Sequence, residues 1–332
     1  MFLFVVGEIT ILWFNLYKKN EEKDFVDLRK VFRLDMRLFR KRLVFILLFA
    51  LSGMLGVYAG GKRALLIGIS TYPTDKYVDF AWSSIHGAND VELLSKTLHN
   101  KGFKIKRLLN ERATAKNIRK SLNALCEETM PGDVVYIHFS GHGQSYEDFS
   151  GDEQDGWDEA IVPYDAKIKY DKEIYDGSAH ILDDELEQYL LAIRAKAGEE
   201  GMVYVVLDAC HMGGASRGED TEDEICFVRG SDMGFSPSGK VYAPPIDKRG
   251  TMPLEVVSGS ADIYVLEACR AYQTNAEIRQ EGVYYGPLSF YINQVIKETD
   301  IARTQSWIEK VRALMERDKR LIRQNMVIEK SR

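Results

Sequence analysis

Runs of consecutive apolar residues alternate along this chain with segments in which apolar residues recur every three or four positions. An unbroken apolar run of about four to eight residues is typical of a strand buried on both faces, as in a parallel sheet. We predict such strands at Arg63–Ser70, Phe103–Leu109, Asp133–Phe139, the first half of Val203–Gly214, Asp262–Ala271 and Gln324–Glu329.

Helical periodicity fills most of the intervals between these runs. We predict helices at Asn89–Asn100, Thr114–Leu125, Asp183–Ala195, Gly286–Ile296 and Thr304–Met315. The acidic stretch Ser145–Glu159 and residues 213–260 are expected to be loops. Alternation of strand and helix favours an α/β fold of three layers, α/β/α, with a mainly parallel central sheet and helices on both faces.

The N-terminal segment has the pattern of a targeting sequence. Met36–Arg42 is basic, Leu43–Val57 is apolar, and Val57-Tyr58-Ala59 ends the run with small residues, as in a secretory signal peptide. We therefore expect residues 1–35 to be an upstream extension, residues 36–59 a signal peptide, and the protein to be exported, periplasmic or extracellular. The alternative is a membrane anchor through residues 43–59, although a spanning helix needs about 20 apolar residues.

Composition narrows the class of partner. The chain has 332 residues, 45% of them hydrophobic, which is enough for a sizeable core in one or two domains. Its net charge of −6 argues against nucleic acid or an anionic membrane as a partner. Four cysteines without a CxxC spacing are too few for a disulfide framework. We expect a monomer that does not bind nucleic acid.

Two of the predicted strands end in residues that can do chemistry. Asp133–Phe139 leads into Ser140-Gly141-His142-Gly143, and the run from Val203 leads into Asp208-Ala209-Cys210-His211. Ligands bind at the carboxyl edge of such sheets, so parallel neighbours would bring His142 and Cys210 together. A thiol and an imidazole within reach make a nucleophile and its base. The N–H groups of Gly143 and Cys210 are candidates to hold an oxyanion.

The wider sequence around this pair resembles one family. The matching stretches are HFSGHGQ at 138–144, GDEQDGWDEAIVPYDA at 151–166, ILDDEL at 181–186, DACHMGG at 208–214, LEACRAYQTNAE at 266–277 and, more weakly, HGAND at 86–90. They resemble the caspase-like cysteine peptidases, most closely the metacaspase branch of bacterial type. The resemblance covers nearly all of residues 63–330, so 60–332 is expected to be a caspase-like peptidase domain.

The resemblance implies roles for individual residues. It makes Cys210 and His142 a catalytic dyad, and it makes Asp208 the floor of the pocket for the side chain before the cleaved bond, with Asp90 and Ser140 beside it. Carboxylates in that pocket favour lysine or arginine, so cleavage is expected after basic residues. Caspases proper use arginines to bind aspartate, and no equivalent arginine is evident near these motifs in the sequence.

The resemblance also implies a calcium site, although no cofactor is expected to be required. Asp158, Asp183 and Asp184 match positions that bind Ca²⁺ in calcium-dependent metacaspases, and carboxylate oxygens suit that ion. The alternative is a solvated acidic loop followed by a helix N-terminus, where acidic side chains favour the dipole. A fourth ligand has no clean match, and Asp220 is a guess.

Other functions stay open at this point. The long loop after Cys210 contains basic residues at which the enzyme could cut itself: Arg217, Arg229, Lys240, Lys248 and Arg249. The main alternative to an endopeptidase is a catalytically weak caspase-like protein with a binding or regulatory role, because a fold does not guarantee a function. A third candidate is another thiol hydrolase, such as a transpeptidase or amidase.

Overall fold

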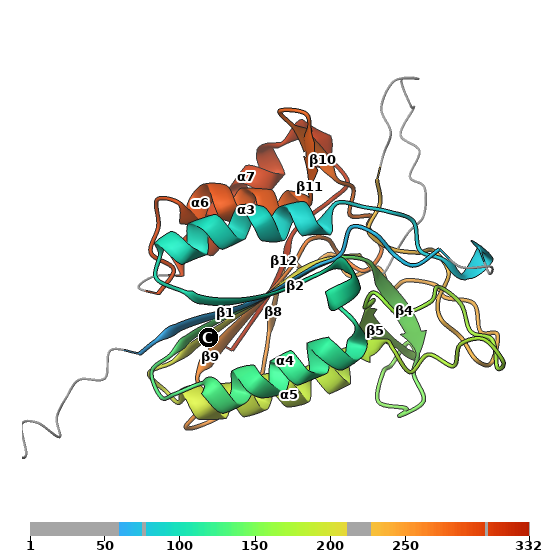
Figure 1. The fold of residues 1–332 in the computed structure, drawn as a ribbon, viewed down its shortest axis with the longest axis horizontal. Helices are drawn as coiled ribbons and strands as arrows, with labels where there is room; N and C mark the ends of the chain where they lie inside the picture. The colour runs from blue at the N-terminus through green and yellow to red at the C-terminus, as the bar shows by residue number, and fades with distance from the viewer. Residues whose placement is uncertain (1–59, 75–77, 211–226, 303–304, 332) are drawn as a thin grey trace, which may run out of the picture. The chain divides into compact units, whose positions relative to one another are not determined.

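A seven-stranded sheet forms the centre of one compact unit, Ala59–Arg332. The structure is a computed structural model and describes residues 60–74, 78–210, 227–302 and 305–331 (Figure 1). The strand order is β2-β1-β3-β7-β9-β12-β8. These strands are β1 (Lys62–Gly68), β2 (Lys104–Leu109), β3 (Val134–Ser140), β7 (Met202–Asp208), β8 (Thr251–Pro253), β9 (Asp262–Glu267) and β12 (Val327–Lys330). Neighbouring strands from β2 to β9 are parallel, and β12 is antiparallel to β9.

Helices cover both faces of this sheet, which confirms the predicted three-layer α/β/α arrangement (Figure 1). The helices are α3 (Gly87–Asn100), α4 (Ala115–Glu128), α5 (Asp183–Ala197), α6 (Pro287–Ile296) and α7 (Ser306–Arg317). On one face α3, α6 and α7 contribute buried residues such as Leu94, Ile292 and Trp307. On the other face α4 and α5 contribute Leu122 and Ile193. Single-turn 3-10 helices lie at Val78–Phe80, Asn110–Arg112 and Lys319–Leu321.

The apolar runs identified in the sequence are the strands at the middle of the sheet. Every residue of β3 is buried, and so are most residues of β7, because helices lie above and below both strands. The two strands pair in parallel with Ser140 opposite Asp208. The residues that follow each strand therefore leave the same carboxyl edge of the sheet, at neighbouring positions.

Two smaller β structures and the short edge strand β8, which lies within the predicted loop 213–260, were not predicted. A three-stranded antiparallel sheet contains β4 (Gly143–Glu147), β5 (Trp157–Ile161) and β6 (Ile181–Leu182), and a hairpin contains β10 (Ile278–Gln280) and β11 (Val283–Tyr285). The prediction that Ser145–Glu159 is all loop is therefore wrong at both of its ends. Its polar residues hid the strands, because they are buried with partners that are distant in sequence; Glu147, for example, is buried and accepts hydrogen bonds from the Ser236 hydroxyl and the Ser238 N–H.

One further predicted strand is shorter in the structure, and several predictions concern residues that the structure does not describe. The strand predicted over Asp262–Ala271 ends at Glu267, so Cys269 lies just beyond it and is buried there. The proposed signal segment, along with His211, Arg217, Asp220 and Cys226, lies outside the described residues. Among the helices that the structure does describe, none is long and apolar enough to span a membrane.

Candidate active site

His142 and Cys210 each lie two residues beyond the paired residues Ser140 and Asp208, so they emerge side by side at the carboxyl edge of the sheet. The chain segments that carry them are in contact. A Cβ atom added to Gly143 would lie 2.8 Å from the main-chain oxygen of Cys210. Glycine is therefore needed at this position for the turn after β3 to approach Cys210.

The imidazole of His142 is buried and held in one orientation. Its ring stacks on Trp82, with centroids 4.7 Å apart and an interplanar angle of 27°. Its Nε2 lies 2.9 Å from the carbonyl oxygen of Ser83. A carbonyl can only accept a hydrogen bond, so Nε2 carries the proton and Nδ1 keeps the basic lone pair. Burial lowers the pKa of His142 to about 4, so the ring is neutral at pH 7.

The Nδ1 atom of His142 is buried and has no hydrogen-bond partner among the residues that the structure describes. A buried lone pair without a donor costs free energy, and such atoms in native structures often belong to functional groups. The tautomer leaves Nδ1 as the ring atom that can accept a proton, while burial disfavours the charged ring.

The thiol of Cys210 is fully buried and donates to the carbonyl oxygen of Gln273, 2.9 Å away. A second thiol, that of Cys269, lies 3.6 Å from the same oxygen. A hydrogen bond with Cys210, together with burial, raises the pKa of the Cys269 thiol well above its usual value. Cys269 therefore stays neutral and can donate to a thiolate on Cys210.

The predicted pocket residues lie together beside this pair. Asp90, Ser140 and Asp208 are all fully buried, and the Ser140 hydroxyl donates to Asp90 Oδ2 at 2.6 Å. Asp208 is held by Ser289, whose main-chain N–H and hydroxyl both donate to its Oδ2. Both carboxylates are thus fixed by neutral donors and keep oxygens available for a cation.

A cation from the same chain fills this pocket. The guanidinium of Arg229 has Nη2 2.8 Å from Asp90 Oδ2 and Nη1 3.4 Å from Asp208 Oδ1, and Nη1 donates to the Ser140 hydroxyl at 2.6 Å. A third carboxylate, that of Glu277, accepts from Arg229 Nε at 3.0 Å and Nη2 at 2.8 Å. All four charged side chains are 0% exposed.

The main chain around Arg229 is extended and hydrogen-bonded on both sides. The Arg229 carbonyl oxygen accepts from the N–H of Cys210 at 2.8 Å and from that of Gly143 at 3.4 Å. The Arg229 N–H donates to the Asn275 carbonyl, and the Glu277 N–H donates to the Phe227 carbonyl. Residues 227–229 therefore add to residues 275–277 as a short antiparallel strand, which is a common way for a protein to hold an extended peptide.

Sequence analysis identified Asp90, Ser140 and Asp208 but missed Glu277 and the position of Arg229. The available signal was the run Ile225–Val228, a short β-favouring stretch within a polar loop and directly before an arginine. Nothing in the sequence indicated that residues 227–229 lie beside the carboxyl edge of the sheet. The other predicted self-cleavage residues that are described, Lys240, Lys248 and Arg249, are exposed.

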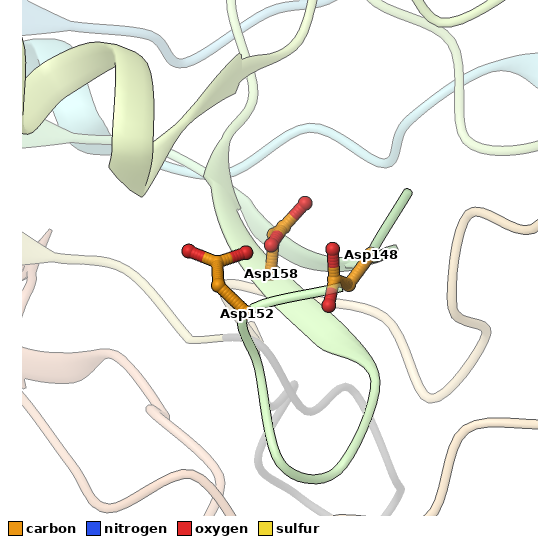
Figure 2. Close-up of side chains that lie close together, drawn as sticks. All are labelled: Asp148, Asp152 and Asp158. Carbon is orange, nitrogen blue, oxygen red and sulfur yellow. The ribbon is translucent and has the colours of Figure 1, made fainter. Parts of the chain in front are cut away.

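Acidic residues at the other end of the small sheet form a second candidate site. The carboxylates of Asp148, Asp152 and Asp158 have ligand atoms within 4.8 Å of one another (Figure 2). Asp158 therefore lies with Asp148 and Asp152, two residues of the β4–β5 loop. The resemblance had instead implied a group of Asp158 with Asp183 and Asp184. Asp183 and Asp184 begin α5.

These carboxylates have the character of cation ligands. Burial, together with repulsion from Asp148, raises the pKa of Asp158 to about 6. Burial, together with repulsion from Glu159 and Asp158, raises the pKa of Asp183 to about 7, and its Oδ1 is buried without a hydrogen-bond partner among the described residues. Carboxylate oxygens are the ligands that Ca²⁺ prefers, so these residues fit the ion.

A cavity of about 570 Å³ lies between α5 and the β9–β12 part of the sheet, and neither His142 nor Cys210 lines it. It is separate from the predicted pocket, in which the guanidinium of Arg229 lies against Asp208.

Comparison with known proteins gives consistent matches. The sequence model of the caspase domain family matches residues 61–331. Metacaspase-1 of Schizosaccharomyces pombe is 27% identical over 277 residues, which cover 72% of this chain and 60% of that protein. Metacaspase-1 of Plasmodium falciparum is 30% identical over 158 residues, 46% of this chain and 24% of that protein. The chain thus spans about three fifths of the length of the first of these relatives.

One solved structure, protein GSU0716 from Geobacter sulfurreducens, has the same fold. It aligns with a TM-score of 0.54 and 19% identity over 82% of this chain and 93% of its own. The resemblance stated from the sequence is therefore confirmed for the family and for its metacaspase relatives, while the bacterial type stays a prediction.

Proposed function

The chain belongs to the caspase domain family, and from this premise we propose that it is a cysteine endopeptidase that cleaves after arginine or lysine. Cys210 is the nucleophile and His142 the base. The N–H groups of Cys210 and Gly143 hold the oxyanion, and Asp208, Asp90 and Ser140 bind the basic side chain before the cleaved bond.

One observation carries this proposal: Arg229 has its guanidinium between Asp90 and Asp208 and its carbonyl oxygen on the N–H groups of Cys210 and Gly143. A substrate residue needs both contacts at once, because the pocket selects the side chain while the N–H groups polarise the bond to be broken. The three carboxylates around Arg229 leave no spare positive charge, which argues against aspartate as the preferred residue.

In the proposed reaction, Nδ1 of His142 takes the proton of the Cys210 thiol, and the thiolate attacks the carbonyl carbon. The negative charge that develops on the oxygen is held by the two N–H groups. The protonated Nδ1 then gives its proton to the leaving amine, and a thioester remains on Cys210. Water hydrolyses the thioester and frees the thiol.

We further propose that the chain processes itself at the bond between Arg229 and Gly230. Arg229 is already seated at the reacting groups, whereas Lys240 and Arg249 are exposed. Intact mass after incubation should show a fragment that ends at Arg229, and Cys210→Ala and Arg229→Ala should both prevent this cut. Lys240→Ala is the matched control and should be cut normally. Cleavage at Lys240 with Arg229 left intact would contradict the assignment.

The specificity is tested with peptides that differ only at the residue before the cleaved bond. Arginine and lysine peptides should be cleaved much faster than an aspartate peptide, and Asp208→Asn should remove most of that preference. A preference for aspartate would overturn the pocket assignment.

The alternative is a catalytically weak caspase-like protein with a binding or regulatory role. It is favoured by the full burial of Arg229, since an occupied pocket keeps substrates out. A transpeptidase or amidase would use the same thioester with a different acceptor. Labelling of Cys210 by a peptidyl electrophile in Arg229→Ala separates a reactive thiol from an inert one, and product analysis with added amines separates hydrolysis from transfer.

Calcium is proposed as a ligand that tunes the enzyme, while the hydrolytic steps themselves need no cofactor. Asp148, Asp152 and Asp158 would hold it, with Asp183 and Asp184 as the alternative partners of Asp158. Calorimetric titration with Ca²⁺ should show binding that Asp148→Asn weakens. Binding that is lost only in Asp184→Asn would favour the set implied by the resemblance, and an EDTA titration without effect on activity would remove the tuning role.

Export is proposed from the basic and apolar segment before Gly60, with anchoring through residues 43–59 as the alternative. The N-terminus of the mature protein decides between them, because removal of the segment predicts a start near Gly60. The substrates are proposed to be proteins or peptides, and the enzyme a monomer without affinity for nucleic acid.

A further inference from the structure

The pocket contains one more carboxylate than the sequence suggested, and its position is informative. The Oε1 atom of Glu277 faces the Nε–Nη2 edge of the Arg229 guanidinium and accepts from both nitrogens. Asp90 and Asp208 instead approach the two terminal nitrogens. The three carboxylates thus divide the guanidinium between them, and Glu277 is the only one of the three with a recorded contact to Nε in the part of the chain that is described.

Lysine cannot reproduce this contact. Its side chain has a methylene group where arginine has Nε, and its ammonium group lies near the position of the guanidinium carbon. A lysine in the pocket would therefore place a methylene against Glu277 Oε1 and stop short of the oxygens that hold Nη1 and Nη2. A buried carboxylate that loses charged hydrogen bonds loses more than an exposed one, because no water replaces them.

Glu277 is also held by groups other than Arg229. The main-chain N–H of His86 donates to its Oε1 at 2.8 Å, and His86 Nδ1 lies 2.5 Å from its Oε2. Its own N–H donates to the carbonyl of Phe227, two residues before Arg229. The same residue therefore contacts the main chain of the docked strand and the side chain of its arginine.

We propose that Glu277 is the residue that makes this pocket select arginine over lysine. The proposal rests on the proposed function only in treating Arg229 as a bound substrate residue. Two charge-assisted hydrogen bonds distinguish the two side chains, so the expected preference for arginine is about ten- to a hundredfold.

Binding measures the pocket without requiring catalysis. The full chain with Cys210→Ala and Arg229→Ala has a free pocket and no nucleophile. Its affinity is measured by calorimetry for a peptide copy of residues 227–231 and for the same peptide with lysine in place of arginine. Arginine should bind about ten- to a hundredfold more tightly, and the added change Glu277→Gln should reduce that ratio to about threefold or less. A ratio that Glu277→Gln leaves unchanged would overturn the proposal.

A second measurement avoids any change to Glu277, in case its substitution prevents folding. A peptide whose arginine carries a methyl group on Nε lacks that donor, and it should bind no better than the lysine peptide. Equal affinity of the methylated and unmethylated arginine peptides would contradict the assignment. If the peptides bind as expected but Arg229→Ala alone does not cleave them, the proposed peptidase activity fails while the role of Glu277 stands.

Discussion

At the scale of single residues, the site depends on the protonation states of His142 and of the carboxylates around Arg229. Ser83 fixes the proton of His142 on Nε2, and burial keeps the ring neutral. The opposite holds in the pocket, where three carboxylates share one guanidinium and burial raises the pKa of Asp90 to about 7 despite the opposing effect of Arg229. A neutral base and an acidic pocket therefore titrate in well-separated ranges.

This separation predicts the pH profile of the open-pocket variant, Arg229→Ala. Asp90 binds a guanidinium only when it is ionised. Its pKa of about 7 includes the lowering effect of Arg229, so in this variant kcat/KM for an arginine peptide should already fall as the pH drops towards 7 from above. Loss of the base by protonation of His142, whose pKa burial lowers, should come at a more acidic pH. Asp90→Asn should lower kcat/KM and remove the limb at the higher pH. The same limb in Asp90→Asn would assign it to another group.

Gly286 gives a second prediction at this scale. Its backbone has φ −65° and ψ 133°, which any residue adopts, but a Cβ there would collide with the carboxylate of Asp208 and the guanidinium of Arg229. In the open-pocket variant, Gly286→Ala should therefore lower kcat/KM for arginine peptides by about ten- to a hundredfold. Gly250→Ala is the control, because a Cβ there meets no atom within 4 Å. Equal rates in the two variants would show that the pocket wall lies elsewhere.

At the scale of elements, the proposed substrate site is a segment, residues 275–277, along which another strand can pair. Residues 275–277 follow β9 and precede the β10–β11 hairpin, and they pair with residues 227–229. Phe227 packs edge-on against the rings of His86 and Tyr284, with centroids 4.6 and 4.9 Å apart. The docked strand is therefore recognised at two side chains, one basic and one aromatic.

The aromatic contact predicts a preference two residues before the arginine. In the open-pocket variant, a Phe-Val-Arg peptide should be cleaved up to about tenfold faster than Ala-Val-Arg, because aromatic pairs contribute beyond their buried area. Tyr284→Ala should reduce this difference. Tyr242→Ala is the control, since Tyr242 packs on Trp157. A difference that persists in Tyr284→Ala would place the aromatic contact on another residue.

At the scale of the whole molecule, the sequence predicts which residues are buried when they are apolar, because an apolar side chain needs no specific partner in the core. The apolar runs of β3 and β7 predict buried strands by themselves, and the residues after them predict the position of His142 and Cys210. Arg229 is different, because it is buried only by virtue of carboxylates from three separate segments, those of Asp90, Asp208 and Glu277. Such a charge looks like an ordinary surface residue until tertiary contacts are known.

The fold also predicts the order of the self-processing reaction. Arg229 is docked in the pocket of its own chain, so the rate constant of cleavage should stay the same over a hundredfold dilution. Active protein added to Cys210→Ala should leave the bond after Arg229 uncut. A rate that falls in proportion to dilution would instead mean that one molecule cuts another.

The seated arginine has a practical consequence for anyone who measures this protein. A tethered segment competes with added peptide at an effective concentration of the order of millimolar. A micromolar fluorogenic peptide would therefore give almost no signal with the uncut chain, however reactive its thiol. A lack of cleavage would therefore reflect a pocket filled by Arg229. Activity on added peptides should be measured on protein in which Arg229 has been cleaved away or replaced.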